Sequence, residues 1–285
     1  MDEARALQES PAPTTVPTIG AAGPGWLFVP ADRPDRFAKA EAISDQIVID
    51  LEDGVREDDK GKARDLLAAS DVRADQACLR INGFASVHID QDLELARQLR
   101  VGSIMVPMAE ADQPFETVAG FHVVALVETA RGVLEAQRIA ARPEVDALAL
   151  GSADLQLDLG ARETDAVAGV FEDLLAFARA NLLFAGRAHG VPVIDSVHPG
   201  VNDDEGLRRT AAVASAYGLD GKLAIHPKQI DIIRSAFTPS RAEIVWATSV
   251  IAEARSRSAG AFVLDGELID EVVIRRAERL VALGG

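Results

Sequence analysis

The stretch VVALVETARG, residues 123–132, contains the pattern that predicts the fold: an apolar run that ends in a carboxylate. Residues 123–127 form a continuous run of Val, Ala and Leu, which is typical of a parallel strand covered on both faces. Glu128 follows at once, and a charge in that position must be solvated, paired or bound to a metal. The surrounding sequence indicates which of these applies.

Seven other apolar runs resemble this one and alternate with segments of helical periodicity. The eight runs cover residues 26–30, 46–53, 77–83, 103–108, 123–129, 147–154, 191–196 and 223–227. Segments between them, such as 58–70 and 90–100, place apolar residues three and four positions apart, which indicates amphipathic helices. Eight strands, each followed by a helix, predict a (β/α)₈ TIM barrel. A doubly wound open sheet is the main alternative.

The chain divides into three predicted regions. Residues 1–22 contain Pro and Thr clusters without periodicity, so we expect a disordered tail. Residues 23–238 form the predicted TIM-barrel catalytic domain. Residues 239–285 form a C-terminal extension, in which a helix over 240–256 is followed by the turn-rich sequence GAFVLDGELIDE and a last helix.

Composition limits the possible partners. Forty-five acidic and 29 basic residues give a net charge of -16, which lacks the basic surface that nucleic acids or anionic lipids require. No run is apolar and long enough to span a membrane, and the first 20 residues lack the pattern of a signal peptide, so we expect a cytoplasmic protein. The single cysteine, Cys78, excludes an internal disulfide and favours a buried, inert thiol.

Polar residues close most of the apolar runs, and in a barrel the active site lies at the carboxyl ends of the strands. These residues are Asp50, Glu52, Asp53, Arg80, Asn82, Glu128, Ser152, Asp154, Asp195 and His226. Such a collection predicts a site at the barrel mouth.

Strand parity predicts which of these side chains converge. Alternation along the fifth run directs Glu128 into the mouth, and alternation along the sixth puts residues 148, 150, 152 and 154 on one face, so that Asp154 points there too. Two carboxylates with no Cys and few His nearby suit Mg²⁺. The alternative is that each carboxylate caps a helix or pairs with an arginine.

The loop after the first run is basic in an otherwise acidic protein. Arg33, Arg36 and Lys39 lie within seven residues, beside Phe28, and they suggest a seat for phosphate groups, although a solvated helix face is the alternative. His198 and His226 lack the spacing of a zinc site. No GxSxG motif is present to support a serine triad.

Taken together, LFVPADRPDRFAKA, IDLEDGV, LRING, LVETARG, GSADL and IHPKQI resemble the citrate lyase beta subunit / HpcH-HpaI aldolase family, particularly its stand-alone CitE-like acyl-CoA lyases. The resemblance covers about residues 26–276. It implies an enzyme that makes or breaks a carbon–carbon bond between acetyl-CoA and a keto acid or glyoxylate with the help of Mg²⁺. Candidate substrates are citramalyl-, malyl- and citryl-CoA.

The resemblance also implies roles for particular residues. Glu128 and Asp154 correspond to the metal ligands, Arg80 to the arginine that binds the keto acid and the enolate oxygen, and Asp270 to the aspartate of a lid. That lid reaches the active site of a neighbouring subunit in a homotrimer. Glu52 is expected to orient Arg80 or metal-bound water, with Asp53 beside it. The remaining expected contacts to substrate or coenzyme A are Phe28, Arg33, Lys39, Ala153, Ile225 and His226.

Two other functions stay open at this point. An HpaI-type aldolase would cleave a free 4-hydroxy-2-keto acid, and a non-catalytic barrel would serve as a binding subunit. The basic loop and the Asp270 lid favour the acyl-CoA lyase over the aldolase. The presence of Arg80, Glu128 and Asp154 argues against a silent barrel. The acid fragment, the physiological direction and subsequent thioester hydrolysis are left open by the sequence.

Overall fold

Eight parallel strands close into a barrel in the order of the chain. The computed structural model describes residues 23–162, 170–257 and 260–284. The barrel closes where β8 pairs with β1, through Gly25↔Lys222 and Trp26↔Leu223. This confirms the (β/α)₈ prediction and excludes the open sheet. The strands are β1 Gly25–Pro30, β2 Gln46–Asp50, β3 Ala77–Arg80, β4 Ser103–Val106, β5 His122–Val127, β6 Val145–Leu150, β7 Val193–Asp195 and β8 Gly221–Ala224. The tail predicted for residues 1–22 lies outside the described residues.

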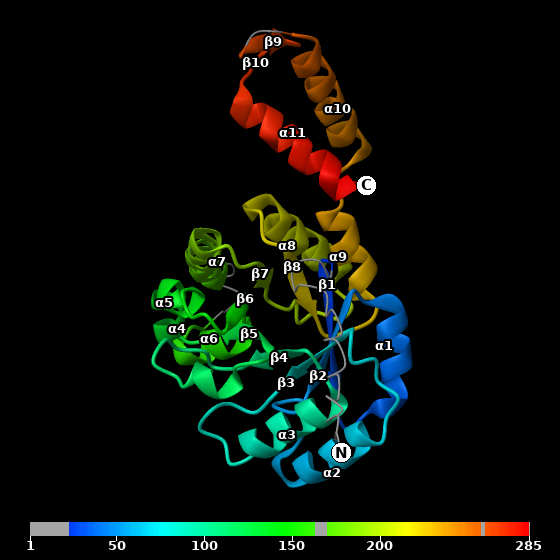
Figure 1. Ribbon diagram of the computed structural model, residues 1–285, viewed down its shortest axis with the longest axis vertical. Coiled ribbons are helices and arrows are strands. Elements are labelled where there is room, and N and C mark those ends of the chain that lie inside the picture. The colour runs from blue at the N-terminus through cyan, green and yellow to red at the C-terminus, as the bar shows by residue number, and fades with distance from the viewer. Residues whose placement is uncertain (1–22, 163–169, 258–259, 285) are drawn as a thin grey trace, which may run out of the picture.

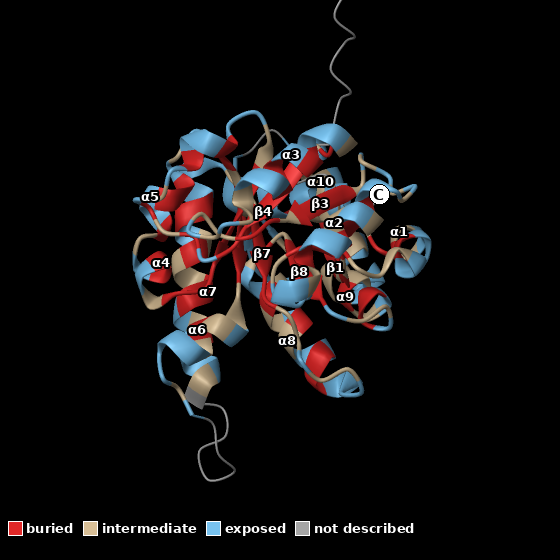
Figure 2. Cartoon of the chain, turned by 90° about the horizontal axis from the view of Figure 1, so that it is seen from below, coloured by how far each residue is buried: buried red, intermediate tan, exposed pale blue. Residues whose placement is uncertain are grey.

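Helices surround the barrel, as Figures 1 and 2 show. The α-helices of the barrel are α1 Phe37–Ile43, α2 Lys60–Ala68, α3 Ile89–Leu99, α4 Ala130–Leu134, α5 Ala136–Ala140, α6 Ser152–Asp158, α7 Val170–His189, α8 Asp204–Tyr217 and α9 Gln229–Phe237. Short 3₁₀ helices are η2 Pro34–Arg36, η3 Glu57–Asp59 and η4 Phe115–Val118. Each strand is followed by a helix as predicted, although the helix after β4 is the short 3₁₀ helix η4. Each helix in the described ranges falls short of the length or apolar character needed to cross a bilayer.

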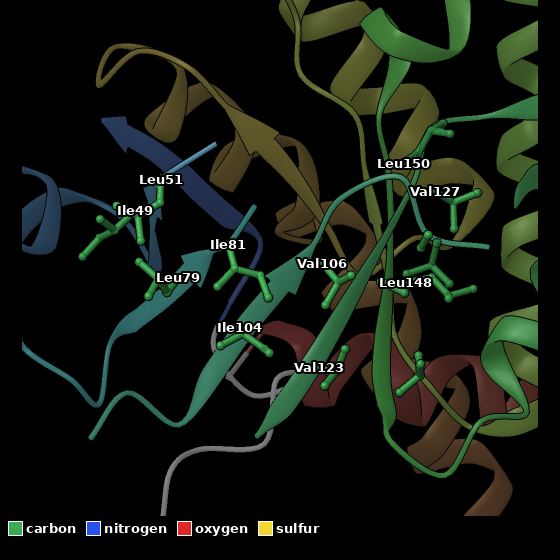
Figure 3. Packing of buried hydrophobic residues seen from close by; sticks show 14 of the residues in the cluster. Ile49, Leu51, Leu79, Ile81, Ile104, Val106, Val123, Val127, Leu148 and Leu150 are labelled. Carbon is green, nitrogen blue, oxygen red and sulfur yellow. The ribbon is translucent and has the colours of Figure 1, made fainter. Parts of the chain in front are cut away.

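The strands separate two apolar regions because their side chains alternate between the two faces. The barrel interior contains Trp26, Val48, Cys78, Met105, Val124, Leu126, Ala147, Ala149, Ile194 and Leu223. The opposite strand faces pack against the helices in a larger cluster, part of which appears in Figure 3, with Ile49, Leu79, Ile104, Val123 and Leu148 among its members. Both faces of each strand are therefore buried, which accounts for the continuous apolar runs in the sequence.

The C-terminal extension projects from one end of the barrel (Figure 1). It contains α10 Arg241–Ser256, the antiparallel pair β9 Phe262–Leu264 and β10 Glu267–Ile269, and α11 Glu271–Gly284. The segment expected to be only turn-rich is a hairpin, whose turn places Asp265 and Gly266 at φ 51° and 86°. This arm has a small core of its own, made of Ala247, Val250, Phe262, Ile269 and Ala277.

Candidate active site

A cavity of about 670 Å³ opens at the carboxyl ends of the strands. Its lining includes Phe28, Arg36, Lys39, Asp50, Asp53, Arg80, Leu126, Glu128, Gly151, Ser152, Ala153, Asp154, Val197, Ile225 and His226. Most of the residues predicted from the sequence therefore lie around one cavity. The predicted residues outside this lining are Arg33, Glu52, Asn82, Asp195 and Asp270. Each has a different environment, and Asn82 is buried, with its Nδ2 donating to Leu51 O and to Asp92 Oδ2.

Arg80 lies in the floor of the cavity, where it is held by two carboxylates. Its Nε and Nη2 atoms donate to the two oxygens of Asp50 at 2.8 and 2.6 Å, and Nη1 lies 3.1 Å from Glu52 Oε2. The guanidinium carbon lies 4.8 Å from the ring centroid of Phe28, a cation–π distance. Burial alone would lower the pKa of Arg80, but the hydrogen bonds and charge of Asp50 raise it above its ordinary value. Arg80 is thus a fixed, permanently charged donor.

The partner of Arg80 was only partly predicted. Glu52 was expected to orient it and does contact it, and burial raises the pKa of Glu52 against the opposing charge of Arg80. Asp53 was also expected to take part, but it lines the cavity without a hydrogen bond or ion pair to Arg80. Asp50 is the bidentate partner instead. The alternation of side chains along the strand could have predicted this contact. Asp50 lies two residues after Val48 and therefore on the same, interior face of β2.

Asp50 also shapes the loop after β2. Its two oxygens accept the backbone N–H groups of Glu52 and Gly54 at 2.9 and 2.8 Å. A Cβ on Gly54 would collide with the Asp50 carboxylate, so only glycine fits there. The same carboxylate therefore fixes both the guanidinium and the loop that carries Glu52.

Glu128 follows the last residue of β5 and is only 3% exposed. The backbone N–H of Met108 donates to its Oε1 at 2.8 Å, and a Cβ on Gly151 would collide with its Oε2. Burial raises the pKa of Glu128 to about 8, and the negative charge of Asp154 adds to that shift while Met108 and Arg80 oppose it. The carboxylate is therefore buried without enough positive charge to stabilise its ionised form.

Asp154 reaches the cavity by a route that strand parity did not predict. The sixth strand ends at Leu150, and Ser152–Asp158 form helix α6. Leu148 and Leu150 belong to the cluster between strands and helices, while Ala147 and Ala149 face the interior. The proposed common face of residues 148–154 was therefore wrong. Asp154 lines the cavity because α6 begins directly at the barrel mouth.

The donor set at the floor fits Mg²⁺. Among the described residues, no group of three or more His, Cys, Asp or Glu side chains forms a metal cage. Mg²⁺ does not need one, because it commonly takes one or two protein carboxylates and keeps waters or substrate oxygens at its other positions. Glu128 and Asp154 supply such a pair at the cavity, and a cation held between them would offset the burial that raises the pKa of Glu128.

The cavity also has basic and aromatic side chains from the segment that runs from β1 to α1. Arg36 and Lys39 line it together with Phe28, whose ring lies against Arg80. Arg33 was expected to join them, but it forms an exposed ion pair with Asp35, with Nε and Nη2 donating at 2.9 and 2.8 Å. Arg36 takes its place in the lining. Ile225 and His226 line the cavity as expected.

Two other acidic residues lie away from this cavity. Asp270 is in the C-terminal arm, where its Oδ1 accepts the N–H groups of Val272 and Val273 at the start of α11. Asp195 was collected among the residues of the mouth, but it is fully buried between the barrel and α7, where Arg179 and Lys222 donate to it at 2.8 and 2.6 Å. The exit of β7 contributes Val197 to the cavity instead.

The closed parallel barrel, with two carboxylates and a guanidinium at its mouth, is typical of TIM-barrel enzymes. Comparison with known proteins identifies the family. Residues 25–227 match the model of the HpcH/HpaI aldolase/citrate lyase family. The chain belongs to this family.

Relatives are similar over nearly the whole chain. A (3S)-malyl-CoA thioesterase of Cereibacter sphaeroides is 34% identical over 90% of this chain and 92% of its own length. The mitochondrial citramalyl-CoA lyase of Rattus norvegicus is 30% identical over 90% of this chain and 84% of its own. The structure of CitE from Mycobacterium tuberculosis in complex with magnesium, acetoacetate and coenzyme A superposes with a TM-score of 0.87 at 39% identity, covering 94% of this chain and all of that one.

Proposed function

We propose that this protein is a Mg²⁺-dependent carbon–carbon lyase that cleaves or forms a 3-hydroxyacyl-CoA such as citramalyl-, malyl- or citryl-CoA. The observation that carries the proposal is that one cavity joins the Glu128 and Asp154 carboxylates and the Arg80 guanidinium to a basic rim. The small reacting end of the substrate fits the charged floor, and the phosphates of coenzyme A fit Arg36 and Lys39. The CitE structure with magnesium and coenzyme A, at 39% identity, supports the same assignment.

The residues of the floor have complementary tasks in such a reaction. In the cleavage direction, the 3-hydroxyl gives up its proton and becomes the carbonyl of the acid fragment. The electron pair of the broken carbon–carbon bond stays on the acetyl carbon and spreads onto the thioester oxygen as an enolate, which regains a proton at carbon to give acetyl-CoA. Mg²⁺, when bound by Glu128 and Asp154, supplies a positive charge that polarises the carbonyl of the acid fragment. Arg80 donates hydrogen bonds to oxygens that gain negative charge, and Asp50 and Glu52 hold it in place without any reorganisation during the reaction.

A carboxylate must also move a proton to or from the acetyl carbon, and we assign this step to Asp270 of a neighbouring subunit. Asp270 lies between β10 and α11. Both elements belong to the arm that projects from the barrel (Figure 1). The arm exposes the apolar side chains of Val263, Leu268 and Val272, which suit contact with another copy of the chain. A homotrimer in which each arm covers the next barrel would place Asp270 over a second cavity.

The decisive experiment is a cleavage assay with citramalyl-, malyl-, citryl- and 3-hydroxy-3-methylglutaryl-CoA, in Mg²⁺ and in EDTA. We expect release of acetyl-CoA from at least one thioester, and loss of that activity in EDTA. The same preparation should be given a free 4-hydroxy-2-keto acid. Turnover of that acid with none of the thioesters would replace this proposal by the HpaI-type aldolase, and no turnover of any of these substrates would indicate a non-catalytic barrel.

A further inference from the structure

The cavity wall next to the loop after β1 is formed by the exits of β7 and β8, and one buried side chain connects them. Gln229, the first residue of α9, is 2% exposed. Its Oε1 accepts the backbone N–H groups of Ile225 and His226 at 2.9 and 3.2 Å. Its Nε2 donates to the carbonyl oxygen of His198 at 2.9 Å. A single amide therefore binds three backbone groups on two loops.

The hydrogen bonds of Gln229 lie beyond the last residues at which β7 and β8 pair with each other. The last paired residues of β7 and β8 are Asp195 and Lys222. Above them, Lys222 Nζ donates to Ser196 O at 2.7 Å, and Gln229 holds His198 O two residues further along. Val197, which lines the cavity, lies between these two fixed carbonyls.

The side of the wall that comes from β8 is held in the same way. Ile225 lines the cavity with its side chain 40% exposed, and its backbone N–H is bound by Gln229. His226 also lines it, and its Nδ1 accepts the N–H of Lys228 at 3.2 Å. An acceptor at Nδ1 leaves the proton of the neutral ring on Nε2. The wall thus presents apolar surface from Val197 and Ile225 together with the imidazole ring of His226.

We propose that Gln229 is a positioning residue for the acyl-CoA substrate: it sets the spacing of the Val197 and Ile225–His226 walls and thereby the affinity for the thioester. This inference rests on the proposed function and adds to it a residue that contacts neither the metal ligands nor Arg80. Its side chain bonds only to backbone, so it acts through the loops it holds. The affinity for the thioester should therefore depend on Gln229, whereas the rate of the chemical step at Glu128 and Arg80 should not.

The test is Gln229→Met, which keeps the volume of the side chain and removes all three hydrogen bonds, compared with Gln229→Glu. The glutamate keeps two acceptor oxygens for Ile225 and His226 but cannot donate to His198 when ionised. We expect Gln229→Met to raise KM for the thioester and the Kd for coenzyme A by about tenfold, with kcat changed by less than about twofold. Gln229→Glu should give an intermediate increase. The Kd for Mg²⁺, measured by calorimetry, should stay at the wild-type value in both.

Gln46→Met is the matched control. Gln46 is also a buried glutamine, and its Nε2 donates to Gln76 O at 2.7 Å, but it starts β2 at the end of the barrel away from the cavity. This variant should lower the melting temperature without changing KM. The inference is overturned if folded Gln229→Met or Gln229→Glu has the wild-type KM and Kd for coenzyme A, or if Gln46→Met raises KM equally. A wild-type protein that neither binds coenzyme A nor cleaves any thioester would instead refute the proposed function.

Discussion

At the scale of single residues, Glu128 shows how an apolar strand can specify a reactive site. Five buried apolar residues of β5 precede it in the sequence. The carboxylate of Glu128 itself lines a cavity, where the backbone N–H of Met108 donates a hydrogen bond to it. Ionising it there is costly without a cation. Stability of the fold therefore does not account for a glutamate at this position. Asp154 adds a second negative charge nearby, and a bound metal ion would be the simplest way to balance both charges.

Replacing Glu128 by glutamine should abolish Mg²⁺ binding while keeping the shape of the site. We expect kcat/KM for thioester cleavage to fall by about a hundredfold or more, because one of two protein ligands loses its charge. Calorimetry with MgCl₂ and initial rates measure the two effects. Glu94→Gln, an exposed change on α3, is the control and should leave both unchanged. A Glu128→Gln protein with wild-type Mg²⁺ affinity would contradict the assignment.

Mg²⁺ affinity should also depend on pH in a defined direction. The pKa of Glu128 is raised to about 8, so without metal the side chain carries a proton at pH 6 and loses it as the pH approaches 8. Only the ionised carboxylate binds the metal, so affinity should increase with pH, by on the order of tenfold or more between pH 6 and pH 8. Calorimetry in buffers of different ionisation enthalpy should detect proton release at pH 6. Equal affinities at both pH values would show that Glu128 is already ionised.

At the scale of elements, the loops and helices that follow the strands carry much of the chemistry. Asp154 enters the site from α6, and Ile225 and His226 come from the turn between β8 and α9. The wall from β7 and β8 depends on polar groups that are buried beside the barrel. Asp195 is the centre of this group, because it accepts from both Arg179 on α7 and Lys222 on β8.

Asp195→Asn should be strongly destabilising because it leaves two buried cations without their shared anion. We expect a loss of about 3–5 kcal/mol in the free energy of unfolding, measured by urea denaturation. Asp75→Asn, in the exposed pair with Arg73, should have little effect. Equal unfolding midpoints for the Asp195→Asn and Asp75→Asn proteins would contradict the prediction.

The same variant tests a dependence on pH. Burial opposes the ionisation of Asp195, but the charges of Lys222 and Arg179 outweigh it and lower the pKa. A carboxylate with a depressed pKa in the folded state stabilises the protein above its unfolded pKa of about 3.9, and this contribution is lost as the pH falls through the folded value. The stability difference between wild type and Asp195→Asn should therefore shrink below about pH 4.

At the scale of the whole molecule, the C-terminal arm is the part whose proposed role depends on other copies of the chain. Its core is separate from that of the barrel, and Asp270 does not line the cavity of its own chain. Within the chain, Asp270 caps α11, and asparagine is an equally good cap. Asp270→Asn therefore removes the carboxylate to which we assign proton transfer while preserving the helix end.

We expect Asp270→Asn to retain its fold, its Mg²⁺ affinity and its oligomeric state but to lose most of its lyase turnover. Mixing it with Glu128→Gln chains, after dissociation and reassembly, should restore activity, up to about a quarter of the wild-type value if subunits combine at random in a closed ring. Restoration requires that an intact arm serve the intact barrel of another chain. Mixtures that remain inactive would show that each arm acts on its own barrel or has no role in catalysis.

The sequence by itself determined the barrel, because strands buried on both faces must be continuous apolar runs, and eight such runs alternate with amphipathic segments. It also determined that Arg80 and Glu128 lie at the mouth, since both follow directly from strand ends. Only the tertiary structure decided that Asp50 holds Arg80, that Arg36 rather than Arg33 reaches the rim, and that Asp154 comes from a helix. The physical reason is that the alternation of side chains along a regular strand determines which face each one occupies. Beyond the last hydrogen bond between strands, the direction of a side chain depends instead on contacts between segments that are distant in the sequence.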